Sequence, residues 1–165
     1  MKLKRALKHL LLPPWIMRRR FPAATLQRIE DAVAASERGH RGELCVVIED
    51  ALDLRPLLRG QMPRERASEL FARHGAWDTA ENSGVLLYIN WADRDIEIVA
   101  DRGISACVDH EQWEAICRGI EQEFRDDRFE DGILEGIRQI TALLARHFPA
   151  RSDNPDELRN RPLTL

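Results

Sequence analysis

The sequence lacks several features that would identify its chemistry directly. Its three cysteines form no C-x-x-C pair, which argues against a disulfide framework and against a structural zinc site. No apolar run approaches the roughly 18–20 residues that a membrane-spanning helix needs. No G-x-x-x-x-G-K-[ST] motif is present, so no nucleotide cofactor is expected. What remains is an ordinary globular composition, with 44% apolar and 32% charged residues in a chain of 165, which is enough for one domain.

The formal net charge of -3 hides an uneven distribution. Residues 1–20 carry seven basic side chains and no acid, and all three lysines of the chain lie there. The rest of the chain is strongly acidic. An acidic body argues against nucleic-acid binding, which normally needs a basic face. The basic segment could instead contact an anionic membrane surface.

Residues 1–24 form a basic, partly apolar arm in which Leu10-Leu11-Leu12 and Trp15 lie between two basic clusters. Such an order is typical of a segment that lies in the headgroup layer of a membrane. Alternatively, the apolar side chains pack on the domain, or the arm is mobile. Pro13-Pro14 and the missing small-residue cleavage site argue against a signal peptide, so we expect a cytoplasmic protein, peripheral at the inner membrane. The expected lipid contacts are Lys2, Lys4, Arg5, Lys8, Trp15, Arg18, Arg19 and Arg20.

Hydrophobic periodicity predicts the elements of the body. Helices are expected over 25–38, 63–75, 109–124 and 129–148, and strands over 43–49, 85–89 and 96–100. The order favours a parallel pair of strands followed by a hairpin. We therefore expect an α/β fold, a three-layer α/β/α sandwich with a small mixed sheet, over residues 25–148. Residues 149–165 read as an extended polar tail.

The hairpin is the clearest local signal, because two strand-like runs flank Asp93-Arg94. If Asp93 and Arg94 form the turn, the strands pair with Trp91 opposite Ile96, Ile89 opposite Ile98, and Leu87 opposite Ala100. One face of this hairpin is then apolar and the other is mixed.

Several motifs together resemble one family. They are Gly42-Glu43, Asn82-Ser83-Gly84, Arg102-Gly103-Ile104, and Arg128-Phe129 followed by Gly132-Ile133. In this order they resemble the TPM domain, a module of thylakoid, photosystem-repair and nematode membrane proteins. The resemblance implies an α/β/α sandwich that binds a divalent cation, calcium or magnesium. It also implies either an accessory role near membranes or an acid phosphatase activity. Ser83 and Asp101 depart from the pattern, which prefers Asn and Gly there.

The expected topology gathers polar residues at one edge of the sheet, where the first two strands start and the third ends. Carboxylate, amide and carbonyl oxygens are the ligands that calcium and magnesium prefer. The candidate ligands are Asp101, Asn82, Glu43, Asp78 and Glu81, with Gly42, Gly84 and Gly103 allowing close backbone approach. Alternatively, Asn82 and Asp109 are turn and capping residues. The opposite edge also holds acids, among them Glu49 and Asp93, but the motifs favour the first edge.

Two functions follow. The first is an accessory or adaptor protein near the membrane surface, with an unknown protein partner, that binds a divalent cation without catalysis. The second is a weak metal-dependent acid phosphatase that hydrolyses phosphomonoesters, which would need a metal-activated water because no nucleophile stands out.

Overall fold

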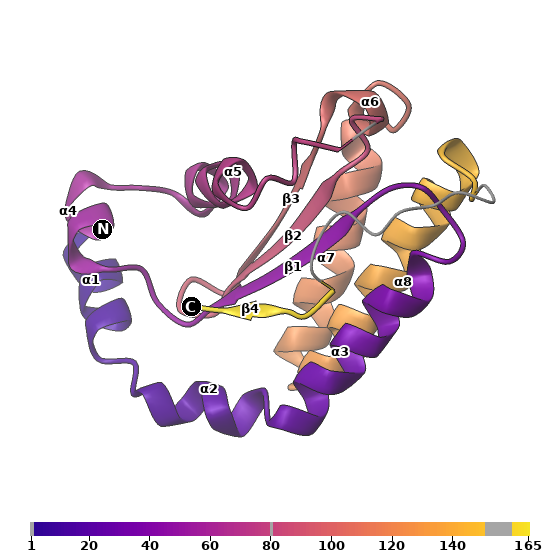
Figure 1. Cartoon of the computed structure of the whole chain (residues 1–165). Helices are drawn as coiled ribbons and strands as arrows, with labels where there is room; N and C mark the ends of the chain where they lie inside the picture. Colours follow the sequence, from indigo (N-terminus) through magenta and orange to yellow (C-terminus); the bar gives the residue numbers. More distant parts are fainter. Residues whose placement is uncertain (1, 80, 151–159) are drawn as a thin grey trace.

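The fold is built on a four-stranded sheet in the order β3-β2-β1-β4 (Figure 1). The computed structural model describes residues 2–79, 81–150 and 160–165. Its strands are β1 (Leu44–Glu49), β2 (Val85–Asn90), β3 (Asp95–Ala100) and β4 (Leu163–Thr164). Strand β1 runs parallel to β2 and to β4, while β2 and β3 form the antiparallel hairpin. The predicted mixed sheet is therefore confirmed, with one strand more than expected.

Every residue of β1 and β2 is buried, as their continuous apolar runs predict for strands that are covered on both faces. Side chains alternate between two separate cores because successive residues of a strand point to opposite faces. In β1, Val46 and Ile48 join the larger core, whereas Cys45 and Val47 join the smaller one.

The larger core lies under three helices, α3 (Ala23–Ser36), α7 (His110–Arg125) and α8 (Phe129–His147) (Figure 1). Gly132 and Gly136 explain how α7 and α8 pack so closely. A Cβ atom on Gly136 would lie 2.5 Å from Ile120 Cδ1, and one on Gly132 would lie 2.9 Å from Glu123 Cβ.

The opposite face is covered by α5 (Pro63–Arg73), which buries Ala67 and Leu70 against the sheet. Helices on both faces confirm the three-layer α/β/α sandwich. Two short helices within the body of the domain were not predicted: α4 (Leu54–Arg59), before α5, and α6 (Arg102–Ser105), directly after β3.

The predicted register of the hairpin is wrong by two residues. Ile89 pairs with Ile96 and Leu87 with Ile98, because β2 already ends at Asn90. The Asn90 Oδ1 atom accepts a hydrogen bond from the Asp93 backbone at 2.9 Å, so that residues 91–94 all belong to the loop. A slip of two residues leaves each side chain on its expected face.

Both ends of the chain are more structured than expected. The basic arm contains α1 (Lys2–Leu10) and α2 (Pro14–Arg20), and α1 packs against α4 (Figure 1). In the expected polar tail, β4 adds to the edge of β1, with the Leu165 backbone donating to Ile48 at 3.0 Å. Within the described residues, no helix combines the length and the hydrophobicity needed to cross a bilayer.

Candidate functional site

The segments expected at one edge of the sheet do meet there. The Val85 N–H donates to the Glu43 carbonyl at 2.8 Å, and the Asp101 N–H donates to the Gly84 carbonyl at 2.8 Å. The Gly103 N–H reaches the Asn82 carbonyl at 2.9 Å. The start of β1, the start of β2 and the end of β3 therefore share this edge, which we call the predicted ligand edge (Glu43, Asp78, Glu81, Asn82 and Asp101).

Two glycines allow this close approach. A Cβ atom on Gly84 would lie 1.8 Å from the Ala76 carbonyl oxygen, so no other residue fits without moving the backbone. A Cβ atom on Gly103 would lie 2.6 Å from the carbonyl oxygens of both Glu81 and Asn82. Gly42 instead faces the Leu144 side chain, with a Cβ position 2.5 Å from its Cδ2 atom.

Most of the polar side chains at this edge already have partners. Asn82 Oδ1 accepts a hydrogen bond from Arg102 Nε at 3.0 Å, and Glu81 forms an ion pair with Arg41. Glu43 is buried and also has a partner, whereas Asp78 is exposed. Arg102 and Arg41 therefore already occupy the Asn82 and Glu81 side chains at this edge.

Asp101 has a different environment. Its Oδ1 atom accepts a hydrogen bond from the Arg102 backbone at 2.7 Å and so caps α6. Its Oδ2 atom is buried and has no hydrogen-bond partner among the described residues. Capping explains the first oxygen but leaves the second unexplained.

The side chains at the predicted ligand edge could hold a divalent cation only if most of its ligands were water. Over the residues that the structure describes, no three His, Cys, Asp or Glu side chains are placed to hold a metal ion together. Asp101 Oδ2 is a hard oxygen donor without a hydrogen-bond partner among the described residues, whereas the Asn82 carbonyl already accepts the Gly103 N–H. A single carboxylate oxygen suits at most a cation that keeps most of its water, as magnesium often does. Asp101 is the residue that would hold such a cation.

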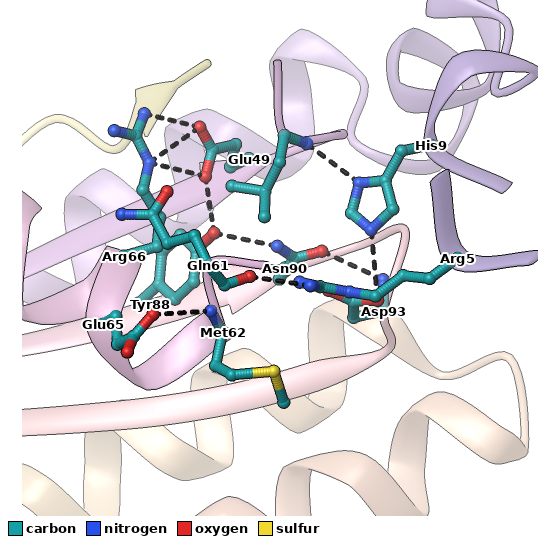
Figure 2. A network of polar contacts seen from close by, with 11 residues as sticks. Arg5, His9, Glu49, Gln61, Met62, Glu65, Arg66, Tyr88, Asn90 and Asp93 are labelled. Atoms are coloured by element: carbon teal, nitrogen blue, oxygen red, sulfur yellow. Dashed lines mark hydrogen bonds and ion pairs between the residues drawn. The ribbon is translucent and has the colours of Figure 1, made fainter. Parts of the chain in front are cut away.

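A second polar cluster lies at the opposite end of the strands (Figure 2). Arg66 of α5 donates to both carboxylate oxygens of Glu49, with Nη2 2.6 Å from Oε1. The Tyr88 hydroxyl donates to Glu49 Oε2, and Asn90 Nδ2 donates to the Tyr88 oxygen at 3.0 Å. Glu49, Tyr88 and Asn90 are all buried. This network has its hydrogen bonds satisfied and joins α5 to the sheet.

The first helix is fastened beside this network. Asp93 accepts hydrogen bonds from Arg5 Nε at 3.0 Å and Arg5 Nη2 at 2.7 Å (Figure 2). His9 Nε2 lies 3.1 Å from Asp93 Oδ1, and His9 Nδ1 accepts a hydrogen bond from the Leu52 backbone at 2.9 Å. Arg5, which was expected to contact lipid, is therefore paired within the protein.

Several large apolar side chains are exposed on and next to α1 and α4. Seven of the nine large apolar side chains that are exposed within the described residues fall in two short segments around these helices. They are Leu7, Leu10, Leu11, Trp15, Leu54, Leu58 and Met62. We call these seven residues the α1–α4 surface. The expectation that the leucines of the arm pack on the domain does not describe Leu7, Leu10 or Leu11.

Exposed basic side chains occur on α1 and α4 and on α2, which follows α1. Those exposed are Lys4, Lys8, Arg18, Arg19, Arg20, Arg55 and Arg59. Arg20 also lies over the Phe129 ring, 4.9 Å from its centroid, and the side chain of Lys2 lies outside the described residues. The sequence analysis did not predict that α4 takes part in this surface. The spacing of Leu54 and Leu58, each followed by an arginine, is the signal that could have found it.

Comparison with known proteins places these features in a family context. The model of the TPM domain family matches residues 19–143. The NMR structure of protein BA42 from the psychrophilic bacterium Bizionia argentinensis is 27% identical, covering 87% of this chain and 94% of its own, with a TM-score of 0.76. The N-terminal domain of a P. gingivalis protein, 17% identical over 78% of this chain and 81% of its own, shares the fold with a TM-score of 0.63. Among curated proteins, none matches this chain.

Proposed function

Since this chain belongs to the TPM domain family, we propose that it is a peripheral accessory module that docks on anionic membrane surfaces through its α1–α4 surface. In this proposal the predicted ligand edge holds at most a hydrated divalent cation and performs no catalysis. The single observation that carries the proposal is the exposure of Leu7, Leu11 and Leu58, at 54%, 67% and 70%, among basic side chains.

The orientation of α1 supports membrane docking. Arg5 and His9 point toward Asp93 and the body of the domain (Figure 2). Leu7 and Leu11 are four residues apart and therefore lie on one helix face, on the side turned away from His9. The leucine face is thus held outward by contacts on the opposite face of the same helix.

The chemistry of the surface favours an anionic bilayer as the occupant. A leucine that enters the acyl boundary contributes on the order of 1 kcal/mol, and each Lys or Arg near an anionic surface adds about 1 kcal/mol. Neither term alone holds a protein of this size on a membrane, but the α1–α4 surface combines both. A neutral protein groove would offer no partner to the exposed Lys4, Lys8, Arg55 and Arg59 of the same helices.

Vesicle flotation tests this proposal. We expect the protein to float with vesicles of phosphatidylcholine and phosphatidylglycerol and not with phosphatidylcholine alone. The double variant Leu7→Gln/Leu11→Gln keeps the helix propensity of α1 and should lower the bound fraction by about tenfold. Trp77→Ala removes an equally exposed apolar side chain that follows α5 and should leave binding unchanged. Equal binding of the double variant and the wild type would refute the proposal.

A further inference from the structure

A groove runs along the outer edge of the sheet, on the far side from β4. It has a volume of about 400 Å³ and is bounded by β3, by α7 and by Arg64 of α5. Strand β3 is the terminal strand of the sheet, so its outer backbone groups face this groove. Most sheet edges that are left open in this way can pair with another chain.

The covered and uncovered parts of the β3 edge can be told apart. Arg64 Nη1 donates to the Ile98 carbonyl, and the Ser105 hydroxyl donates to the Ala100 carbonyl at 3.0 Å. These two carbonyls therefore point away from β2. Alternate residues of an antiparallel strand share the direction of their backbone groups, so the N–H and C=O of Ile96 also point outward. Ile96 lines the groove, and no side chain in the described part of the chain forms such a hydrogen bond with its carbonyl.

Two buried polar atoms of residues that line the groove have no hydrogen-bond partner in the described part of the chain. One is the indole Nε1 of Trp113, a groove-lining residue that is only 6% exposed. The other is Asp95 Oδ1, at the start of β3. An N–H donor and a carboxylate acceptor beside a free strand edge are the groups that an added peptide would satisfy.

The groove is acidic on balance. Four acids line it against two arginines, and both arginines are already paired, Arg64 with Glu97 and Arg118 with Glu114. The acids of the groove are Asp95, Glu97, Glu114 and Glu121. Burial, followed by the charges of Glu97, Glu121 and Asp93, raises the pKa of Asp95 to about 6. A cationic partner would relieve this repulsion, whereas a second copy of β3 would add to it.

We propose that the outer edge of β3 binds an extended, basic segment of a partner protein as an added strand at Ile96, with a lysine or arginine of that segment paired to Asp95. Backbone pairing provides affinity and the acidic groove selects the basic side chain, as in other recognition by strand addition. Because Arg64 and Ser105 cover the later residues of β3, the added strand is short. This inference does not depend on membrane binding.

Titration of the full-length ¹⁵N-labelled protein with short blocked peptides tests the proposal. The probe alternates lysine and threonine, and one control peptide carries glutamate in place of lysine. We expect saturating shifts of the Ile96 amide and the Trp113 indole signals with the lysine peptide and none with the glutamate peptide. A lysine peptide with a central proline, which cannot pair as a strand, should also fail to shift them.

Variants of the groove sharpen the test. Asp95→Asn should weaken binding of the lysine peptide about fivefold, while Glu111→Gln, which removes an exposed acid of α7 outside the groove, should change it less than about twofold. Arg64→Gln uncovers the Ile98 carbonyl and should strengthen binding. Equal binding of the lysine and glutamate peptides would overturn the proposal. So would shifts of β3 signals that grow with protein concentration in the absence of peptide, because a second copy would then occupy the edge.

Discussion

Arg5 and Asp93 lie 88 residues apart in the sequence and form an ion pair with Nη2 2.7 Å from Oδ2, which fastens the first helix to the tip of the β2–β3 hairpin. The Asp93 side chain is only 14% exposed, and it also faces His9. This contact decides which face of α1 is turned outward, so it controls the orientation of Leu7 and Leu11.

Asp93→Ala should release α1 from the domain. The substitution removes the contacts that Asp93 makes with Arg5 and His9. Partly buried, charge-assisted hydrogen bonds of this kind stabilise the docked helix by about 2 kcal/mol in total. We expect amide hydrogen exchange in α1 to accelerate at least about tenfold, while exchange in β1 and β2 stays slow. Asp78→Ala, which removes an exposed aspartate elsewhere, serves as the control. Unchanged protection of α1 in the Asp93 variant would show that other contacts hold the helix.

Lowering the pH should also release α1 from the domain, because it protonates Asp93. Burial alone would raise the pKa of Asp93, but hydrogen bonds from Arg5 and His9 outweigh it and lower that pKa below its ordinary value. A carboxylate with a lowered pKa stabilises the docked helix above the ordinary aspartate pKa, and this contribution is lost as the pH falls through the lowered value. The side-chain carboxyl ¹³C signal of Asp93 should therefore change only below about pH 4, and amide exchange in α1 should accelerate over the same range. A midpoint well above that pH would contradict this assignment.

The sequence predicts the sheet well because its signals are local. Unbroken apolar runs identify β1 and β2 as strands covered on both faces, and the proximity of two such runs identifies the hairpin. Its register was misjudged because the strand end depends on the hydrogen bond from Asp93 to the Asn90 side chain, a contact that the apolar pattern does not encode. The slip of two residues preserved the assignment of faces.

The candidate site was only partly predictable for the same reason. The convergence of the Glu43, Asn82 and Asp101 segments follows from topology, which the order of elements determines. The partners of Asn82 and Glu81 do not follow from it, since Arg102 and Arg41 reach them through long side chains whose conformations depend on packing. The position of α1 depends on Arg5 and Asp93, and a single pair so distant in sequence leaves no periodic signal.

Tyr88 should not ionise while the protein is folded. Burial, together with the hydrogen bond to Glu49 and its charge, raises the pKa of this phenol far above its ordinary value. Tyr88 is the one tyrosine of the chain, so the near-ultraviolet absorbance of phenolate reports on it alone. We expect no phenolate signal until alkali unfolds the protein, and titration near pH 10 in urea.

The sign of the linkage follows from this raised pKa. Above about pH 10 the unfolded chain loses the phenolic proton and the folded chain keeps it, so stability falls as the pH rises further. Tyr88→Phe should abolish the phenolate signal entirely and destabilise the fold by about 1 kcal/mol, because Asn90 Nδ2 loses its acceptor. A folded protein that titrates at the ordinary value would show that the network opens readily.

Replacing a glycine by alanine should have opposite effects on stability at two positions, Gly84 and Gly119. Gly84→Ala places a Cβ atom 1.8 Å from the Ala76 carbonyl oxygen, a backbone atom that cannot move alone, and should destabilise the fold by about 3 kcal/mol. Gly119→Ala lies inside α7 with no heavy atom within 4 Å of the added Cβ, and should stabilise the fold by about 0.5–1 kcal/mol. Urea unfolding monitored by circular dichroism checks both. Similar midpoints for the two variants would contradict the close packing at Gly84.

Asp101 allows the capping role and the cation role to be separated. In the presence of a chelator, Asp101→Ala should lower the free energy of unfolding by about 1 kcal/mol, because the Arg102 N–H at the start of α6 loses its acceptor. Asp101→Asn keeps an oxygen at that position and removes the charge from the buried, unpartnered Oδ2 atom, so its stability should be close to that of the wild type. The difference between the two variants measures the cap.

Calcium or magnesium at about 10 mM should then stabilise the wild type by about 1 kcal/mol, as expected for a ligand that binds the folded state with millimolar affinity. The same cation should not stabilise Asp101→Asn, because an amide oxygen is a weaker and uncharged ligand. Thermal unfolding of both proteins with and without the cation provides the comparison. An equal rise in the two unfolding temperatures would mean that the cation binds elsewhere, and that burial of Asp101 Oδ2 is a cost of capping α6 alone.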